Sequence, residues 1–372
     1  MSARKLSYVV LGVASIVTPV LAQVPDLMNS LDAGGRAMGM GGSLYSSGSD
    51  TLSSYYNPAG LGYVRETTVG AVYRNLPKST TTASGQLNDP VLSTTSQSGG
   101  REITHFGAIF PMAGGGLGLS YTVGGFIDDF RSGNVSIGGD PVDNYAERIR
   151  LKQDFFSLAY GHSSSDATFS YGFGLMYAQQ SLRDQRAGSV NGGSLAADVS
   201  GTTGGLGGII GVQFNPRGTN MSYGLSYRSE INLSNNEGTS LLADKIPARL
   251  KGGLAMRQDG IRGGKDFVLY GFDVTHFFKV NNGSDLFNRK DQTTFGLGAE
   301  YNYSLGTSRV PIRLGYEFIP AGGIGFGDRN NLTFGIGYRP QGNDFTLDLN
   351  FGKPQHGGFD LGLSLTYKLG SK

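Results

Sequence analysis

Cysteine and tryptophan are both absent from this chain. Without cysteine, neither a disulfide framework nor a thiolate metal site can form. The sequence has no H-E-x-x-H or G-x-S-x-G motif. A Ser/His pair that comes together only in the folded protein, as in an outer-membrane phospholipase, would not be visible as a sequence motif. We therefore predict no cofactor, no metal site and no enzyme activity. The few histidines lie on separate segments without the spacing of metal ligands: His105, His162, His276 and His356.

Long apolar runs are also absent, because no stretch approaches the ~20 apolar residues that a transmembrane helix needs. The N-terminus combines the basic pair Arg4-Lys5, an apolar run at 6–17 and small residues ending at Ala22. This pattern is typical of a cleaved signal peptide, with an uncleaved anchor as the alternative. We predict a signal peptide at 1–22, cleavage near Ala22 and an exported mature chain.

A strong net charge is the third absence. The whole chain has 31 basic residues, and loss of Arg4 and Lys5 with the signal peptide leaves 29 against 29 acidic residues. A nucleic-acid-binding protein would need a basic face. The charge balance therefore argues against nucleic acid as a partner.

Glycine and aromatic residues are abundant instead, with 61 glycines, 21 phenylalanines and 19 tyrosines. The glycines follow no three-residue period, which excludes collagen. Mean hydropathy is slightly negative. A β-barrel in a membrane accounts for this value, because only alternate residues of each strand face lipid.

From residue 65 onward the chain repeats one pattern, about ten residues of alternating apolar and polar character followed by turn residues. In 359–369, for example, Phe359, Leu361 and Leu363 alternate with Asp360 and Gly362. Counting such segments predicts fourteen strands. They lie near 66–75, 101–110, 116–127, 152–162, 167–181, 205–215, 221–231, 247–258, 266–279, 292–304, 309–318, 329–339, 344–352 and 358–369.

The connections between these strands alternate in length. Those at 76–100, 128–151, 182–204, 232–246, 280–291 and 319–328 are long or polar, whereas the others are mostly tight turns. Outer-membrane barrels place long loops outside and short turns in the periplasm. A soluble sandwich or propeller also has glycine-rich strands, but it has no reason to alternate so regularly, and we find no blade repeat. The fold class is therefore all-β, a transmembrane antiparallel barrel of about fourteen strands over 65–372, with an N-terminal hatch or plug over 23–64.

The polar sides of the strands carry charges of both signs. Opposite charges in a narrow barrel either pair with each other and with a plug, or line a path for solute. We favour pairing, because an empty lumen of this width would leak and the residues before the first strand would block it. The charged residues predicted to face the lumen are Arg228, Lys251, Arg257, Asp273, Glu300, Arg313, Glu317, Asp348, Asp360 and Lys368.

The glycine-rich stretch at 34–61 carries the most specific pattern in the sequence. Its glycines allow tight turns close to a barrel wall, and Asn57-Pro58 reads as an N-cap and first-turn proline of a short helix. The stretch resembles the N-terminal hatch of the FadL/TodX family of outer-membrane transporters. The hatch residues that match are Gly35, Arg36, Gly39, Gly41, Gly42, Asn57, Pro58, Ala59, Gly60 and Leu61.

The resemblance implies a fourteen-stranded barrel whose hatch moves to open a path. It also implies a third strand that bends inward and leaves a lateral gap, and Gly124-Gly125 in the third predicted strand is suited to such a kink. The chain departs from the family in two places. It carries a single carboxylate, Asp50, where many relatives have an acidic pair, and its last residues do not end on an aromatic.

We therefore predict a monomeric outer-membrane channel for passive uptake of hydrophobic small molecules of the long-chain fatty acid or hydrocarbon class, gated by the hatch. Its partners would be outer-membrane lipid and the solute. The alternatives are a PorV-like barrel that serves protein secretion or surface attachment, and a closed structural barrel or porin. Polar loops such as 76–100 favour a protein partner, whereas apolar anchors at 280–291 and 319–328 favour transport.

Overall fold

The structure is a computed structural model that describes residues 34–85, 92–137, 140–235, 242–282, 288–322, 328–342, 344–354 and 359–370. The predicted signal peptide, residues 23–33 of the predicted hatch and His356 lie outside the described residues. No helix within the described residues is long and apolar enough to cross a membrane.

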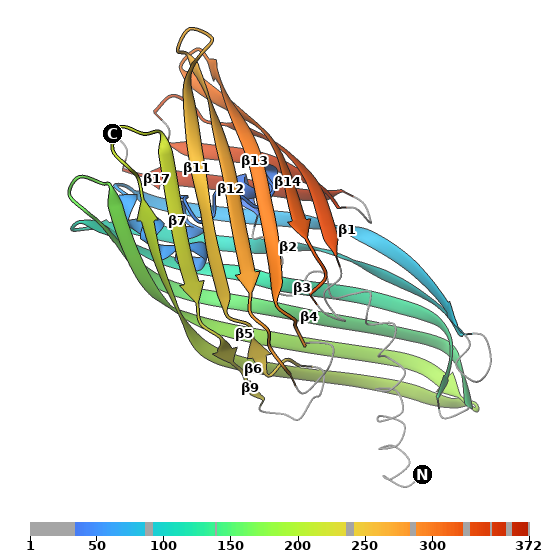
Figure 1. Cartoon of the computed structure of the whole chain (residues 1–372). Coiled ribbons are helices and arrows are strands. Elements are labelled where there is room, and N and C mark those ends of the chain that lie inside the picture. Colours follow the sequence, from blue (N-terminus) through green and yellow to red (C-terminus); the bar gives the residue numbers. More distant parts are fainter. Residues whose placement is uncertain are drawn as a thin grey trace.

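Fourteen strands of the described residues form one closed antiparallel barrel, in which each strand pairs with its neighbours and β17 closes the ring against β1 (Figure 1). The predicted strand number is confirmed. The strands are β1 (Thr67–Gly85), β2 (Leu92–Met112), β3 (Gly115–Ile137), β4 (Asp140–Ser163), β5 (Phe169–Val190), β6 (Gly193–Phe214), β7 (Met221–Arg228), β11 (Arg249–Ile261), β12 (Asp266–Phe277), β13 (Gln292–Leu305), β14 (Ser308–Ile319), β15 (Arg329–Tyr338), β16 (Phe345–Pro354) and β17 (Asp360–Leu369). The connection from β7 to β11 contains β8 (Ile231–Asn232), β9 (Ser234–Asn235) and β10 (Lys245–Ile246).

Strands β1 to β6 are much longer than the sequence predicts, so three of the predicted loops are wrong. Most of 76–100, 128–151 and 182–204 is strand, and the pairing of β5 with β6 continues to Val190 and Gly193. Beyond the apolar band both faces of a strand are polar, so the alternation in hydropathy fades while the backbone hydrogen bonds continue. In Figure 1 these long strands extend well past β7 and β11.

The barrel exposes its apolar side chains and buries its polar ones. Along β15, Leu332, Phe334 and Ile336 are 41–48% exposed, while Asn331 and Thr333, which alternate with them on the other face, are buried. A water-soluble protein buries its apolar side chains, so the opposite arrangement here indicates an apolar medium outside the barrel. Such a medium offers no hydrogen bonds, and closure of the ring gives the backbone groups their partners within the barrel.

Residues 34–64, called the inner segment below, lie inside the ring of strands. The segment contains η2 (Gly35–Met40), α2 (Ser53–Tyr56) and η3 (Pro58–Tyr63), shown in blue in Figure 1. Its contacts reach every strand of the barrel. The first helical turn packs against β13 to β17 and the last against β3 to β6, so the segment follows the circumference of the wall.

Candidate functional site

Glycines on the barrel wall let the inner segment approach its backbone. On β7, a Cβ added to Gly224 would lie 1.8 Å from the Ser46 carbonyl oxygen. On β14, a Cβ added to Gly315 would lie 2.2 Å from the Gly41 nitrogen. Eight neighbouring strands of the wall, β4 to β7 and β11 to β14, each contribute one such glycine. At each of them an atom of the inner segment would lie 2.7 Å or less from the added Cβ. These residues are Gly161, Gly172, Gly211, Gly224, Gly253, Gly271, Gly298 and Gly315.

An ion-pair network anchors the beginning of the inner segment. Arg36 donates from Nε and a terminal nitrogen to the two carboxylate oxygens of Glu300 on β13, at 2.7 and 2.6 Å. Glu300 is fully buried and also accepts from Arg313 at 2.7 Å. Arg313 reaches Asp348 at 2.8 Å, and Arg339 lies 3.7 Å from Glu300. Arg36 is the only arginine of the inner segment, and the wall supplies the buried carboxylate of Glu300 as its partner.

Asp273 on β12 anchors the middle of the segment. Its carboxylate accepts hydrogen bonds from the backbone nitrogens of Leu44 and Ser46, at 3.2 and 3.0 Å, and from the Ser46 hydroxyl at 2.9 Å. Lys251 pairs with the same carboxylate at 3.4 Å. One lumenal ion pair thus holds three polar groups of the inner segment.

The end of the segment forms the capped turn that the sequence predicts. Asn57 is the N-cap of η3, its side-chain oxygen accepts from the Ala59 nitrogen at 3.1 Å, and Pro58 begins the helix. Asn57 also donates to the Ser46 carbonyl at 2.6 Å and to the Val212 carbonyl of β6 at 3.2 Å. The predicted hatch residues are therefore brought together inside the barrel. Gly35, Gly39, Gly41, Gly60, Ala59 and Leu61 are buried among them, and Gly35, Gly41 and Gly42 have positive φ.

Two ionisable groups of the inner segment are shifted by burial. Burial raises the pKa of the Asp50 carboxyl, which accepts a hydrogen bond from the Leu52 nitrogen at 2.9 Å. Burial also raises the pKa of Tyr63 to about 12.

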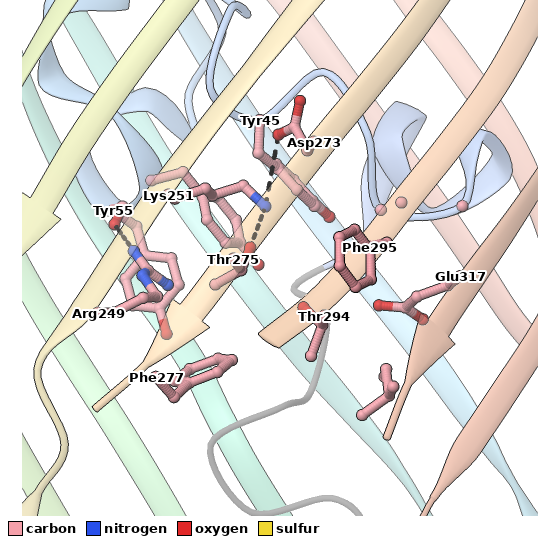
Figure 2. A pocket seen from close by; sticks show the side chains of 15 residues that line it. Tyr45, Tyr55, Arg249, Lys251, Asp273, Thr275, Phe277, Thr294, Phe295 and Glu317 are labelled. Carbon is pink, nitrogen blue, oxygen red and sulfur yellow. Dashed lines mark hydrogen bonds and ion pairs between the residues drawn. The ribbon is translucent and has the colours of Figure 1, made fainter. Parts of the chain in front are cut away.

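A cavity of about 50 Å³ remains between the inner segment and β11 to β14 (Figure 2). Its wall carries two cations over aromatic rings, with Lys251 5.1 Å from the centre of the Tyr45 ring and Arg249 5.0 Å from that of Tyr55. Figure 2 also shows the hydrogen bond from Lys251 to Thr275, at 2.9 Å. A site needs about 10–15 Å³ of this kind of volume to hold one water, so this one has room for ordered water.

Beyond the inner segment, an apolar cluster fills the lumen on the long-loop side. The connection from β7 to β11, predicted only as a long or polar loop, contributes Ile231 and Ile246, both fully buried. They belong to one cluster with Leu151 and Leu182 of the wall and Tyr55 of the inner segment. The apolar loop anchors predicted from the sequence lie instead at 280–291 and 319–328. Of these, Ile319 is the last residue of β14 and is buried, whereas Leu286, Phe287, Ile324 and Phe326 lie outside the described residues.

Two buried arginines at this level lack a carboxylate partner among the described residues. Arg228 and Arg249 are 2% and 4% exposed. Arg228 donates to the Pro247 carbonyl and Arg249 to that of Tyr55, both at 2.8 Å. The Arg228 guanidinium also lies 5.1 Å from the centre of the Phe155 ring. Carbonyl dipoles and ring faces stabilise these cations without neutralising them.

The barrel wall is not fully paired between β2 and β3. Ser98 pairs with Asp129 and His105 pairs with Thr122, in the same register. Between these two pairs, residues 99–104 of β2 and 123–128 of β3 do not pair with each other. A register shift between Val123 and Gly125 makes Gly124 an extra residue against β4. A second shift, in β1 between Val72 and Tyr73, makes Thr104 of β2 the extra residue.

At this gap β3 leaves the plane of the wall. Glu102 of β2 reaches Lys152 of β4 at 3.2 Å, across the position that β3 would fill. A Cβ added to Gly124 would lie 3.1 Å from the Tyr55 hydroxyl of the inner segment, so the strand bends toward the lumen. Phe126 is 8% exposed and packs against Gly100 within the gap.

The predicted lumenal charges differ in their surroundings. Arg228, Lys251, Asp273, Glu300, Arg313, Asp348 and Asp360 are buried. Asp360 pairs with Arg74, which the sequence analysis did not single out. Glu317 and Lys368 are half-buried, and Lys368 pairs with Glu66 at 3.2 Å. Arg257 is exposed near the end of β11 and pairs with Asp259 at 2.8 Å, because the strand there runs past the inner segment. The described residues hold no group of three or more His, Asp or Glu side chains arranged for a metal ion.

No protein-family model and no curated protein sequence matches this chain. Solved structures do. A FadL homologue from Pseudomonas aeruginosa superposes with a TM-score of 0.62 and 14% identity, over 92% of this chain and 99% of its own. The chain has the FadL-type barrel fold. The toluene transporter TbuX of Ralstonia pickettii gives a TM-score of 0.57 at 15% identity, over 92% and 99% of the two chains. TodX of Pseudomonas putida, also a toluene transporter, gives 0.53 at 16%, over 93% and 99%. The predicted resemblance to FadL-type proteins is thus confirmed in the fold, which is that of outer-membrane barrels.

Proposed function

We propose that this FadL-type barrel is an outer-membrane channel for passive uptake of hydrophobic small molecules, and that the inner segment is its hatch. The observation that carries the proposal is that the inner segment lies inside the ring and contacts all fourteen strands. A segment in this position would obstruct the lumen, so a solute would pass when the segment or the wall beside it moves. No nucleotide-binding motif accompanies the barrel, which favours diffusion down a gradient.

The unpaired gap between β2 and β3 supports a lateral route out of the lumen. The backbones at 99–104 and 123–128 do not pair with each other, whereas the other neighbouring strands of the wall are paired. The inward bend at Gly124 brings this gap beside Tyr55. Rotation of Phe126 away from Gly100 would open the wall at the boundary between the headgroups and the hydrocarbon. An apolar solute would then enter the bilayer from its headgroup region.

The buried arginines favour a solute with an acidic head. A neutral hydrocarbon would gain nothing from Arg228 and Arg249, whereas a carboxylate would supply the counter-ion that neither arginine has among the described residues. The apolar cluster that includes Ile231 and Ile246 would then contact the chain of the same molecule. Among hydrophobic solutes we therefore propose the long-chain fatty acid class rather than simple hydrocarbons.

Uptake assays test this choice. In cells without their own transporter, the protein should support uptake of a labelled long-chain fatty acid. Arg249→Gln should reduce fatty acid uptake about tenfold, as expected for loss of a charge-assisted hydrogen bond, while any toluene uptake stays unchanged. Arg217→Gln is the control, because Arg217 is an exposed arginine that pairs with Asp166 in a turn. Equal uptake by Arg249→Gln and wild type would refute the acidic-head proposal.

Joint deletion of Thr104 and Gly124 tests the route. The double deletion removes the extra residue of β2 and of β3 and keeps these two strands in register, so both should pair without a bulge and the gap should close. Fatty acid uptake should fall to background while the barrel still shifts on gels with and without boiling. Normal uptake by a folded barrel would show that solute leaves by another path.

One observation favours a protein partner as a second candidate. The extended, polar parts of β1 to β6 form a wall beyond the apolar band, which suits contact with a secreted or surface protein. Mass spectrometry of protein gently extracted from its own membrane separates the two functions. A fatty acid at about one per barrel supports uptake, and a stoichiometric protein without such a ligand supports the PorV-like function.

A further inference from the structure

A row of aromatic side chains crosses the outer face of three neighbouring strands. Tyr121 on β3, Phe156 on β4 and Tyr177 on β5 have ring centres 5.4 and 6.4 Å apart in succession. On the short-turn side of this row the outer face is apolar, with Leu158 45% and Leu175 66% exposed. Aromatic girdles lie at the boundary between hydrocarbon and headgroups. The row therefore marks that boundary on this face.

A groove of about 440 Å³ lies on the other side of the row, over the gap between β2 and β3. This volume is within the range of small-molecule sites. More cations than carboxylates line it. The charged lining residues are Arg101, Arg150, Lys152 and Arg183, against Glu102 and Asp128.

The ion pairs of the groove leave donors unused. Asp128 accepts both bonds of a bidentate pair with Arg148, at 2.9 and 2.8 Å, and holds Arg150 only through Nε at 3.3 Å. The Arg150 side chain is 47% exposed. Arg183, 52% exposed, forms a bidentate pair with Asp198 at 3.1 and 2.8 Å, which leaves its other terminal nitrogen. Lys152 pairs with Glu102 at 3.2 Å and lies 3.6 Å from Asp154. Both guanidiniums can therefore bind a further anion, and exposed pairs of this kind are weak enough to rearrange.

We propose that this groove binds the phosphate group of an outer-leaflet membrane lipid. The phosphate would lie between Arg150, Lys152 and Arg183, and the acyl chains would follow the apolar surface past Phe156 to Leu158 and Leu175. Charge and apolar surface are arranged in the order that an amphipathic lipid requires. A free phosphate ion would use only the cations, and a solute leaving the barrel would not need them. The proposal does not depend on the uptake function, although the groove lies over the same gap.

Native mass spectrometry of the full-length barrel in detergent tests the site. The probe is diphosphoryl lipid A, compared with the same lipid after enzymatic dephosphorylation. Wild-type protein should retain about one phosphorylated lipid per barrel, and the dephosphorylated form should be retained at least tenfold less. The double variant Arg150→Gln/Arg183→Gln should also retain at least tenfold less.

The control variant is Arg217→Gln/Arg262→Gln, which removes two exposed, aspartate-paired arginines at the short-turn end and should bind like wild type. The heat shift on gels checks that each variant is folded. Equal retention of the dephosphorylated lipid, or by the groove variant, would overturn the proposal. So would displacement of the lipid by millimolar inorganic phosphate, which would make the groove a site for free anions.

Discussion

Loss of the Arg36 anchor should loosen the hatch by an amount that the structure allows us to estimate. Arg36→Met removes two hydrogen bonds to the carboxylate of Glu300, at 2.7 and 2.6 Å, while keeping most of the side-chain length. Hydrogen bonds to charged groups contribute roughly 1.5–3 kcal/mol each. The Arg36 side chain is 33% exposed and Glu300 keeps its bond to Arg313, so we take about 2–3 kcal/mol for the pair.

This loss changes the population of the displaced segment. At about 1.4 kcal/mol per tenfold, the fraction of time with the inner segment away from the wall should rise roughly 30- to 150-fold. Planar bilayer recordings measure it as the open fraction of single channels. The same substitution at Arg262, whose pair with Asp266 does not involve the inner segment, should leave the open fraction unchanged. If Arg36→Met and Arg262→Met gave the same open fraction, the ion pair would not hold the hatch.

Three further predictions concern the same element. Deletion of 23–63 should produce a steady increase in ion conductance, and an unchanged conductance would mean that this segment does not block the lumen. Gly315→Val should raise conductance because its Cβ would meet the Gly41 backbone at 2.2 Å, whereas Gly252→Val, with its nearest neighbour at 3.4 Å on the outer face, should not. Burial raises the pKa of Asp50 above its ordinary value of 3.8, so protonation favours the seated segment. The open fraction should thus increase as pH rises through 3.8 to the raised pKa, and Asp50→Asn should flatten that dependence in the same recordings.

The sequence alone was sufficient to predict the class of fold. Alternation such as that of Leu332, Phe334 and Ile336 is a local property with a period of two, and it needs no knowledge of neighbouring strands. The cap at Asn57-Pro58 is local too, since its bonds lie within two residues. The position of a glycine-rich stretch between a predicted signal peptide and the first strand is likewise visible in the sequence.

The gap and the extended strands could not be predicted in the same way. Polar residues at 182–204 look like a loop because a strand outside the membrane needs no apolar face, and only the pairing of β5 with β6 shows that it is strand. Gly124-Gly125 was singled out as a possible kink among 61 glycines. That the pairing of β2 with β3 is interrupted beside it depends on register, which is a property of two strands and not of one.

The candidate site depends most strongly on tertiary structure. Arg36 and Glu300 are 264 residues apart in sequence. Arg228 and Arg249 differ from the lumenal arginines that pair with carboxylates only in the groups that the folded barrel places around them. Closure of the barrel determines which strands face each other across the lumen, and therefore which charges are neutralised and which remain to attract a ligand. The sequence determines that such a barrel forms and that its interior is charged. Only the closed ring decides which of those charges contact the inner segment.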